Sequence, residues 1–358
     1  MPVWDSDVVP RGLELHEPPR RTEGRVEPRD GALALHYGMC GARFRFEGPL
    51  LALVLQDDEY GGANTVGVRI DRGPELVLTC QPNGRARLHL AAADLQPGWH
   101  EAHVYRRSAT WRGTLLWRGI ALAGGCGVEE APAWTDGLRL EMYGDSVLSG
   151  EAVEHVGFEG REDAVALEHS YAGAEDRATN AWWGYGAILA RELGCRASIQ
   201  VIGGLSLLDG TGWYCQPDPI GLESTFDKAC PIPGRMTPWD FSRFRADWVL
   251  VGIGQNDANG GRPHDPDFRS RWKETYLRVL DRLRSEHGNP RFLLFTTILM
   301  HDPVWDDLLD EVAEEAGPGV LRHRFRRNGS GTPGHPRIAE QLEMAEELAE
   351  AIRKHLPG

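Results

Sequence analysis

The sequence predicts a two-domain α/β protein, in which a β-sandwich over residues 1–130 precedes a doubly wound parallel-sheet domain over residues 131–358. The chain has 358 residues, which is long for a single hydrophobic core. Up to about residue 130, short apolar alternations are broken by Gly, Pro and Asn, whereas strand-like runs alternate with long helical stretches afterwards. This change of rhythm places the domain boundary at the connector "APAWTDG".

The first part of the chain predicts an all-β sandwich, because many short strands separated by turn residues are typical of that architecture. The expected strands cover residues 33–38, 42–48, 50–57, 65–71, 74–80, 86–92, 100–107 and 113–122.

The second part predicts a parallel sheet that is covered by helices on both faces. The expected strands cover residues 138–143, 196–202, 247–253 and 291–300. The expected helices cover residues 180–194, 270–288 and 335–356. Active sites in such sheets lie at the carboxyl ends of the strands.

The charge of the chain restricts its partners. The formal net charge is −14 without any Lys/Arg-rich block, which disfavours nucleic acid and anionic membranes and favours a neutral or cationic substrate. Neither a signal peptide nor a stretch of about 18 apolar residues is visible, so we expect a cytoplasmic protein without membrane contact. Cys215 and Cys230 could cross-link one loop, but thiols are expected in a reducing compartment. The oligomeric state stays open, a homo-oligomer included.

Residues suited to acyl transfer follow the predicted strands. "GDS" places Ser146 after the first strand, where its hydroxyl would lie beside backbone donors, although Gly, Asp and Ser also form ordinary turns and caps. The next strand ends at Gly203 and Gly204, where a backbone N–H can approach a ligand closely. "GQND" places Asn256 after the third strand, and the last loop carries His335. Together they supply a nucleophile, oxyanion donors and a general base.

These blocks resemble those of the SGNH (GDSL-type) hydrolases, which run Gly-Asp-Ser, Gly, Gly-x-Asn-Asp and Asp-x-x-His. "GDS" and "GQND" match the first and third blocks letter for letter. The resemblance implies that Ser146 is the nucleophile and His335 the base. It also implies that Gly204 and Asn256 form the oxyanion hole with the Ser146 N–H, with Gly203 as the alternative to Gly204. No metal or organic cofactor is required.

The two aspartates inside these blocks, Asp145 and Asp257, are expected to contact the substrate. The fourth block departs from the family pattern, because Thr332 stands where an acid is expected three residues before the histidine. His335 would then be oriented by a backbone carbonyl or by an acid from elsewhere. The candidate acids are Asp302, Asp306 and Asp307. The alternative is that these acids only start a helix, where the helix dipole favours negative charge.

A jelly-roll sandwich ahead of an SGNH domain is similar to carbohydrate esterase family two, with "LQPGWHEAHVYRRSATWRGTLLWRGIAL" closing the sandwich. Enzymes of that family remove acetyl groups from sugars, typically at the primary 6-hydroxyl, and tolerate a Ser-His dyad. The resemblance therefore implies a serine esterase acting on acetylated carbohydrates. Two other classes stay open: a catalytically weak carbohydrate-binding protein, and an SGNH lipase or thioesterase acting on other esters.

Four aromatic residues are expected on the rim of the site, where sugar rings can stack on them: Trp213, Tyr214, Trp239 and Trp305. The alternative is that they only pin down a long loop. No metal site is predicted, because the histidines outside these blocks lack ligand spacing.

Overall fold

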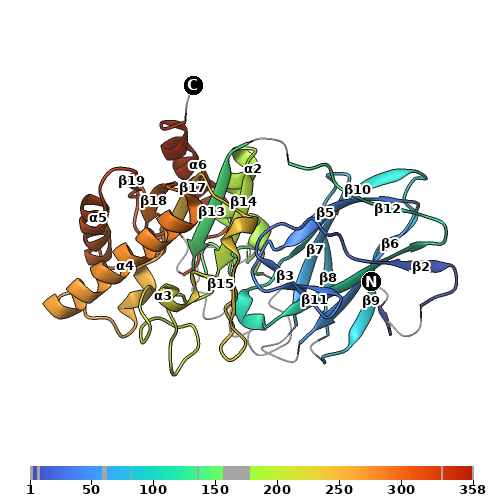
Figure 1. Cartoon of the computed structure of the whole chain (residues 1–358), viewed down its shortest axis with the longest axis horizontal. Helices are drawn as coiled ribbons and strands as arrows, with labels where there is room; N and C mark the ends of the chain where they lie inside the picture. Colours follow the sequence, from blue (N-terminus) through green and yellow to red (C-terminus); the bar gives the residue numbers. More distant parts are fainter. Residues whose placement is uncertain are drawn as a thin grey trace. The chain divides into compact units, whose positions relative to one another are not determined.

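The computed structural model describes residues 3–5, 9–58, 63–81, 83–134, 137–155, 178–331 and 334–356 (Figure 1). Two compact units divide the chain, one built on Met1–Thr135 and the other on the residues from Asp136 onward. No helix among the described residues is long and apolar enough to cross a membrane.

The first unit is a sandwich of antiparallel sheets, as predicted. Its strands are β1 (Val3–Asp5), β2 (Leu13–His16), β3 (Val26–Arg29), β4 (Ala32–Leu35), β5 (Gly41–Glu47), β6 (Leu51–Asp57), β7 (Thr65–Ile70), β8 (Leu76–Thr79), β9 (Ala86–Ala92), β10 (Trp99–Arg106), β11 (Leu115–Ala123) and β12 (Val128–Glu130). One sheet has the order β1-β9-β6-β11-β4-β3 with β2 paired to β11, and the other has the order β12-β5-β10-β7-β8.

Alternation along the strands builds the core of the sandwich. In β5, Phe44 and Phe46 are fully buried, while Arg43 and Arg45, which alternate with them, are partly exposed. The ring of Phe44 lies 5.9 Å from that of Trp117 in β11, so the two sheets meet through aromatic side chains. All the strands predicted for this unit are present. The prediction missed β1, β2, β3 and β12, which are short and carry few apolar residues.

The second unit is built on a parallel sheet. Its strands are β13 (Arg139–Gly144), β14 (Arg196–Val201), β17 (Trp248–Gly252), β18 (Arg291–Phe295) and β19 (Val320–Arg322), in the order β14-β13-β17-β18-β19. The longer helices are α2 (Tyr185–Glu192), α4 (Pro266–His287), α5 (Val304–Ala316) and α6 (Ile338–Arg353). Shorter pieces are η3 (Ala181–Trp183), α3 (Leu222–Thr225), β15 (Lys228–Cys230), β16 (Thr237–Pro238), η4 (Phe241–Arg243) and η5 (Gln255–Ala258).

The strand order makes this unit doubly wound, as predicted. The chain leaves β13 toward β14 and then returns to continue through β17, β18 and β19 on the other side. Right-handed crossovers in opposite directions place their helices on opposite faces of the sheet. Accordingly, α2 packs with α6 and α4 packs with α5 (Figure 1). The order reverses beside β13, and ligands bind at such switch points.

Several boundaries differ from the predicted ones. The helix expected at 180–194 is shorter, because η3 precedes α2. Helix α4 begins earlier than expected, at Pro266, because the Asp265 side chain caps it. Strand β18 ends at Phe295 and not at residue 300, and α5 and β19 were not predicted. Cys215 and Cys230 are both thiols in the structure.

Candidate active site

Ser146 lies in the turn directly after β13, at the carboxyl edge of the sheet. Gly144 ends the strand, and a Cβ there would come within 2.7 Å of the Leu148 side chain, so the turn requires glycine. Asp145 Oδ1 accepts the backbone N–H of Val147 at 2.9 Å, which fixes the start of the turn. The residues that follow form turns.

The structure brings His335 to Ser146 across 189 residues of sequence. Its Nε2 lies 2.8 Å from the Ser146 hydroxyl oxygen, and only 6% of Ser146 is exposed. Arg337 donates to the carbonyl of His335 at 2.7 Å, and its own N–H is accepted by Glu340 at 2.9 Å in the first turn of α6. The loop that carries the imidazole is thereby tied to a helix. An imidazole nitrogen accepting from a serine hydroxyl has the geometry of a general base with its nucleophile.

Thr332, which replaces the expected acid, lies outside the described residues. The three aspartates considered as substitutes are bonded elsewhere. Asp302 accepts the backbone N–H of Val304 at 3.0 Å, at the start of α5. Asp306 accepts from the Thr296 hydroxyl at 2.5 Å, and Asp307 binds an arginine side chain at 2.8 Å. The structure therefore supports the alternative in which these acids belong to the start of α5.

The predicted glycines lie in the turn that follows β14. The N–H of Leu205 donates to the carbonyl of Ile202 at 3.2 Å, which places Gly203 and Gly204 at the centre of the turn. Gly204 has a φ of +74°, a conformation that favours glycine. No described residue accepts a hydrogen bond from the backbone N–H of Gly204 or Ser146. These two donors can therefore serve a ligand.

Asn256 lies in η5, directly after β17, and links the two turns. Its Nδ2 donates to Asp145 Oδ2 at 2.8 Å and to the carbonyl of Leu205 at 3.2 Å. Both amide protons therefore point toward the edge of the sheet where Ser146 and Gly204 lie. The longer of these two bonds is the one to the neutral carbonyl.

Asp145 is fully buried, which argues against the expected substrate contact at this residue. Its oxygens accept from Val147, Gln255 and Asn256. Burial raises the pKa of Asp145 to about 6, although the hydrogen bonds from Val147 and Gln255 and the charge of His335 oppose that rise. Asp145 therefore holds the turn that carries Ser146 together with the side chains of Gln255 and Asn256.

Asp257 is also fully buried, which argues against a substrate contact for it too. It accepts the backbone N–H groups of Leu207 and Leu208 at 2.7 and 3.2 Å and the Thr211 hydroxyl at 3.1 Å. Burial raises the pKa of Asp257 to about 7. This carboxyl ties the loop after Gly204 to the segment that carries the amide donor.

Among the four expected rim aromatics, Trp213 is the exposed one, with 62% of its surface accessible. Its backbone N–H donates to the carbonyl of Gly204 at 2.9 Å. A Cβ on Gly204 would lie 2.6 Å from the Cβ of Trp213, so the tryptophan sits directly on this turn. An accessible indole therefore lies beside one of the two available backbone donors.

The other three aromatics are buried, which argues against a position on the rim for them. Trp305 is 1% exposed and packs on Trp272 of α4 with ring centroids 6.1 Å apart. Tyr214 is 6% exposed and donates to the carbonyl of Pro231 at 3.1 Å. Trp239 is 7% exposed. These side chains hold the loop and the helix layer together, which was the alternative explanation.

Sequence reasoning missed Gln255 and Thr297. The Gln255 side chain donates to Asp145 Oδ2 at 2.9 Å and is bonded to Thr297 through both of its ends. Gln255 is the variable letter of "GQND", and Thr297 lies in a run predicted to be strand. A polar residue inside a run expected to be buried was the signal available for Thr297.

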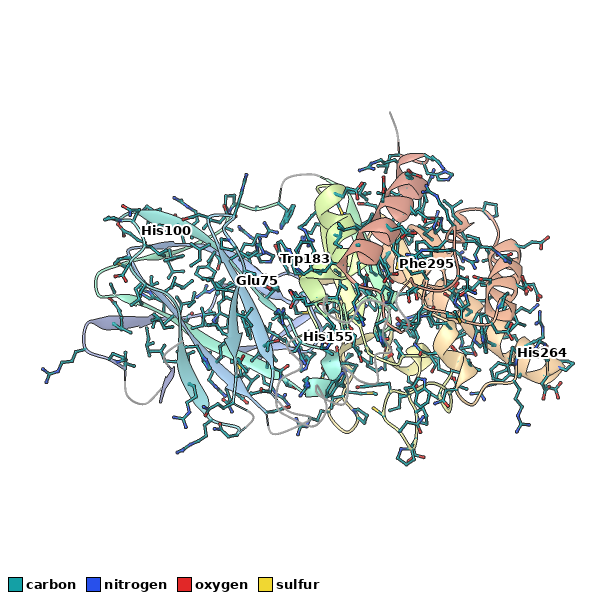
Figure 2. The ribbon with its side chains drawn as sticks, turned by 180° about the vertical axis from the view of Figure 1, so that it is seen from behind. Glu75, His100, His155, Trp183, His264 and Phe295 are labelled. Carbon is teal, nitrogen blue, oxygen red and sulfur yellow. The ribbon has the colours of Figure 1, made fainter. Side chains whose placement is uncertain are left out.

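No three His, Cys, Asp or Glu side chains come together as a metal site in the described ranges. Of the histidines outside the active-site blocks, His155 and His264 lie far apart in the second unit (Figure 2). His301 is bonded to the carbonyl of Leu299 at 2.7 Å.

Comparison with known proteins agrees with this architecture. Residues 22–132 match the family model described as "Carbohydrate esterase 2 N-terminal". A family two carbohydrate esterase from Clostridium thermocellum, solved in complex with cellohexaose, superposes with a TM-score of 0.78 over 94% of this chain and 98% of its own, at 19% identity. The chain has the fold of a family two carbohydrate esterase.

Other solved structures share this carbohydrate-esterase fold. The family two carbohydrate esterase from Cellvibrio japonicus has a TM-score of 0.78 and 22% identity, covering 96% of this chain and 97% of its own. An acetyl xylan esterase, Est2A, from Butyrivibrio proteoclasticus has a TM-score of 0.76 and 16% identity, covering 98% and 96%. No curated protein sequence matches the chain.

Proposed function

We propose that this chain is a serine esterase that removes acetyl groups from carbohydrates, with short sugars acetylated at the primary 6-hydroxyl as the preferred substrates. The observation that carries the proposal is the 2.8 Å contact between His335 Nε2 and the Ser146 hydroxyl oxygen. It lies at the carboxyl edge of the sheet, beside two backbone N–H groups without a described acceptor.

In the first half-reaction, Ser146 Oγ attacks the acetyl carbonyl carbon while its proton passes to His335 Nε2. The carbonyl oxygen becomes an oxyanion, which accepts from the N–H groups of Ser146 and Gly204 and from the amide of Asn256. When this intermediate collapses, the bond to the sugar oxygen breaks and His335 returns the proton to that oxygen. The sugar leaves, and the acetyl group stays on Ser146.

In the second half-reaction, His335 takes a proton from water as the water oxygen attacks the acetyl-serine. The same donors hold the second oxyanion. Its collapse releases acetate, and Ser146 recovers the proton. Each step uses groups of this chain and water alone.

Carbohydrate is the proposed leaving group because of the surface beside the reaction centre. Trp213 is 62% exposed, and its backbone N–H donates to the carbonyl of Gly204. Its indole can therefore stack on the apolar face of a sugar ring. The net charge of −14 disfavours polyanionic substrates. The similar structure from Clostridium thermocellum is described in complex with cellohexaose, and Est2A is named an acetyl xylan esterase.

Release of acetate from Ser146→Ala and wild-type protein tests the chemistry. We expect wild-type turnover of p-nitrophenyl acetate and of acetylated sugars, with position-resolved NMR showing loss of the 6-O-acetyl group. Ser146→Ala should fold normally and retain less than a few per cent of kcat, because the nucleophile is gone. Equal rates for both proteins would contradict the proposal and favour the carbohydrate-binding class.

Trp213→Ala tests the substrate class. The variant should raise KM for a sugar ester far more than KM for p-nitrophenyl acetate, which has no sugar ring to stack. Leu342→Ala is the matched control, since this exposed apolar side chain lies on α6. Equal changes for both substrates would assign Trp213 to support of the loop.

A further inference from the structure

Gln255 lies in η5, next to Asn256, and no step of the proposed reaction uses it. Only 6% of this residue is exposed, and its carboxamide makes four hydrogen bonds to described residues. We propose that Gln255 is a positioning residue, which holds the Asp145 carboxylate in the orientation that fixes the amide of Asn256. The inference rests on the proposed esterase function, in which Asn256 is an oxyanion donor.

The partners of Gln255 determine which way its carboxamide points. Its Oε1 accepts the backbone N–H of Thr297 at 2.8 Å and the Thr297 hydroxyl at 2.9 Å. A backbone N–H can only donate, so the oxygen end must face Thr297. The Nε2 end therefore donates to Asp145 Oδ2, at 2.9 Å. Thr297, in the loop after β18, thus orients the Gln255 amide so that its N–H donates to Asp145, in the turn that carries Ser146.

Two side-chain amides share one oxygen of Asp145. Oδ2 accepts from Gln255 at 2.9 Å and from Asn256 at 2.8 Å, while Oδ1 accepts the N–H of Val147. Rotation of the carboxylate toward one amide would lengthen its bond to the other. Without Gln255, the position of Oδ2 would depend on Asn256 alone, and Asn256 would lose its fixed partner.

The charge on Asp145 also depends on Gln255. Burial raises the pKa of Asp145 to about 6, and the hydrogen bond from Gln255 lowers it. The other groups that face this carboxyl are His335, which lowers the pKa, Glu151, which raises it, and the phenol of Tyr185. Loss of the Gln255 donor therefore raises the pKa of Asp145 further. A protonated carboxyl is a weaker acceptor than a carboxylate, so it holds the Asn256 amide less firmly.

Gln255→Met keeps the size of the side chain and removes its donor. We expect kcat for p-nitrophenyl acetate at pH 7 to fall about tenfold or more, with KM unchanged, because a hydrogen bond to a charged group is lost. We also expect the acidic limb of the kcat profile to move upward by about one pH unit.

Gln341→Met is the matched control. Gln341 is fully buried and braces the same turn, since it donates to the Val147 carbonyl at 3.0 Å and accepts the Tyr185 N–H at 2.8 Å. In the described part of the chain its amide bonds Val147 and Tyr185 and not Asp145, so its replacement should leave the acidic limb in place. A role of Gln255 in packing alone predicts the same pH profile for both variants, and that result would overturn the proposal.

Gln255→Glu is a second variant, in case the methionine variant does not fold. One of its oxygens can still accept from Thr297, while the other faces Asp145 Oδ2, so the two carboxyls compete for one proton. We expect kcat of this variant to fall as pH rises through neutrality, opposite to Gln255→Met. An unchanged profile in Gln255→Glu would overturn the proposal.

A measurement without turnover separates this inference from the proposed function. In Ser146→Ala protein labelled with ¹³C, the titration of the Asp145 carboxyl should lie near pH 6 and move upward when Gln255→Met is added. Absence of that movement would overturn the positioning role, whatever the activity. Absence of esterase turnover in wild-type protein, with the movement present, would contradict the proposed function alone.

Discussion

Replacing Asn256 with alanine removes the side-chain donor that links the turn of Asp145 and Ser146 to the turn of Gly203 and Gly204. The amide donates to Asp145 Oδ2 at 2.8 Å and to the Leu205 carbonyl at 3.2 Å, and the oxyanion is expected to take the place of that carbonyl. Loss of one oxyanion donor lowers kcat by about 100-fold to 1000-fold, or about 2.7–4 kcal/mol of transition-state stabilisation. We expect Asn256→Ala to fall in this range.

The same change should cost far less in folding. Asp145 keeps its hydrogen bonds from Val147 and Gln255, so its buried charge is not left without donors. The Leu205 carbonyl loses one partner. We therefore expect the free energy of unfolding to fall by about 1–3 kcal/mol, the cost of an unsatisfied buried group.

Steady-state kinetics with p-nitrophenyl acetate and denaturant unfolding measure the two effects separately. Asn259→Ala is the control, because this nearby amide donates to the Gly212 carbonyl at 2.6 Å and, among the described residues, makes no hydrogen bond to Asp145. Its kcat should stay within a small factor of wild type. An Asn256→Ala effect confined to KM would refute the reasoning and make Asn256 a substrate contact.

Two further predictions concern the base and the buried tryptophan. His335→Ala should abolish esterase activity, whereas Thr332→Ala should cost much less, because threonine supplies no carboxylate to orient the imidazole; comparable losses of kcat in both variants would contradict this. Trp305→Ala should lower the free energy of unfolding by about 3–5 kcal/mol, since a fully buried ring packed on Trp272 is lost. Denaturant unfolding measures this loss. A raised KM for sugar esters in a variant of unchanged stability would instead indicate that Trp305 contacts the substrate.

Local pattern predicted the fold where strands are half-buried and bounded by turn residues. In β5 the alternation of buried phenylalanine with outward arginine is visible in the letters alone. Strand β18 shows the limit of this approach. The apolar run continues to residue 300, but Thr296 and Thr297 leave the ladder to bond Asp306 and Gln255. Those partners are 10 and 42 residues away in sequence, so no local pattern reveals them.

The positions of Ser146 and Asn256 could be predicted because they follow from the topology of the sheet. Ser146 and Asn256 each come directly after a strand of one parallel sheet, and parallel strands end at the same edge. Gln255 also lies after a strand, one residue from Asn256. Its role depends on the partners that its amide meets. The sequence does not reveal that Thr297 bonds both ends of this amide and that Asp145 accepts from its nitrogen.

Trp213 and Tyr214 show why the rim could not be predicted. They are neighbours in one loop, yet the first is 62% exposed and the second 6%. Trp213 is held by the carbonyl of Gly204, whereas Tyr214 reaches the carbonyl of Pro231, 17 residues further on. The loop between β14 and the pair is fixed in turn by the buried carboxyl of Asp257, about 50 residues away. Composition indicates that aromatic residues gather near the site, but hydrogen bonds between residues distant in sequence decide which of them is exposed.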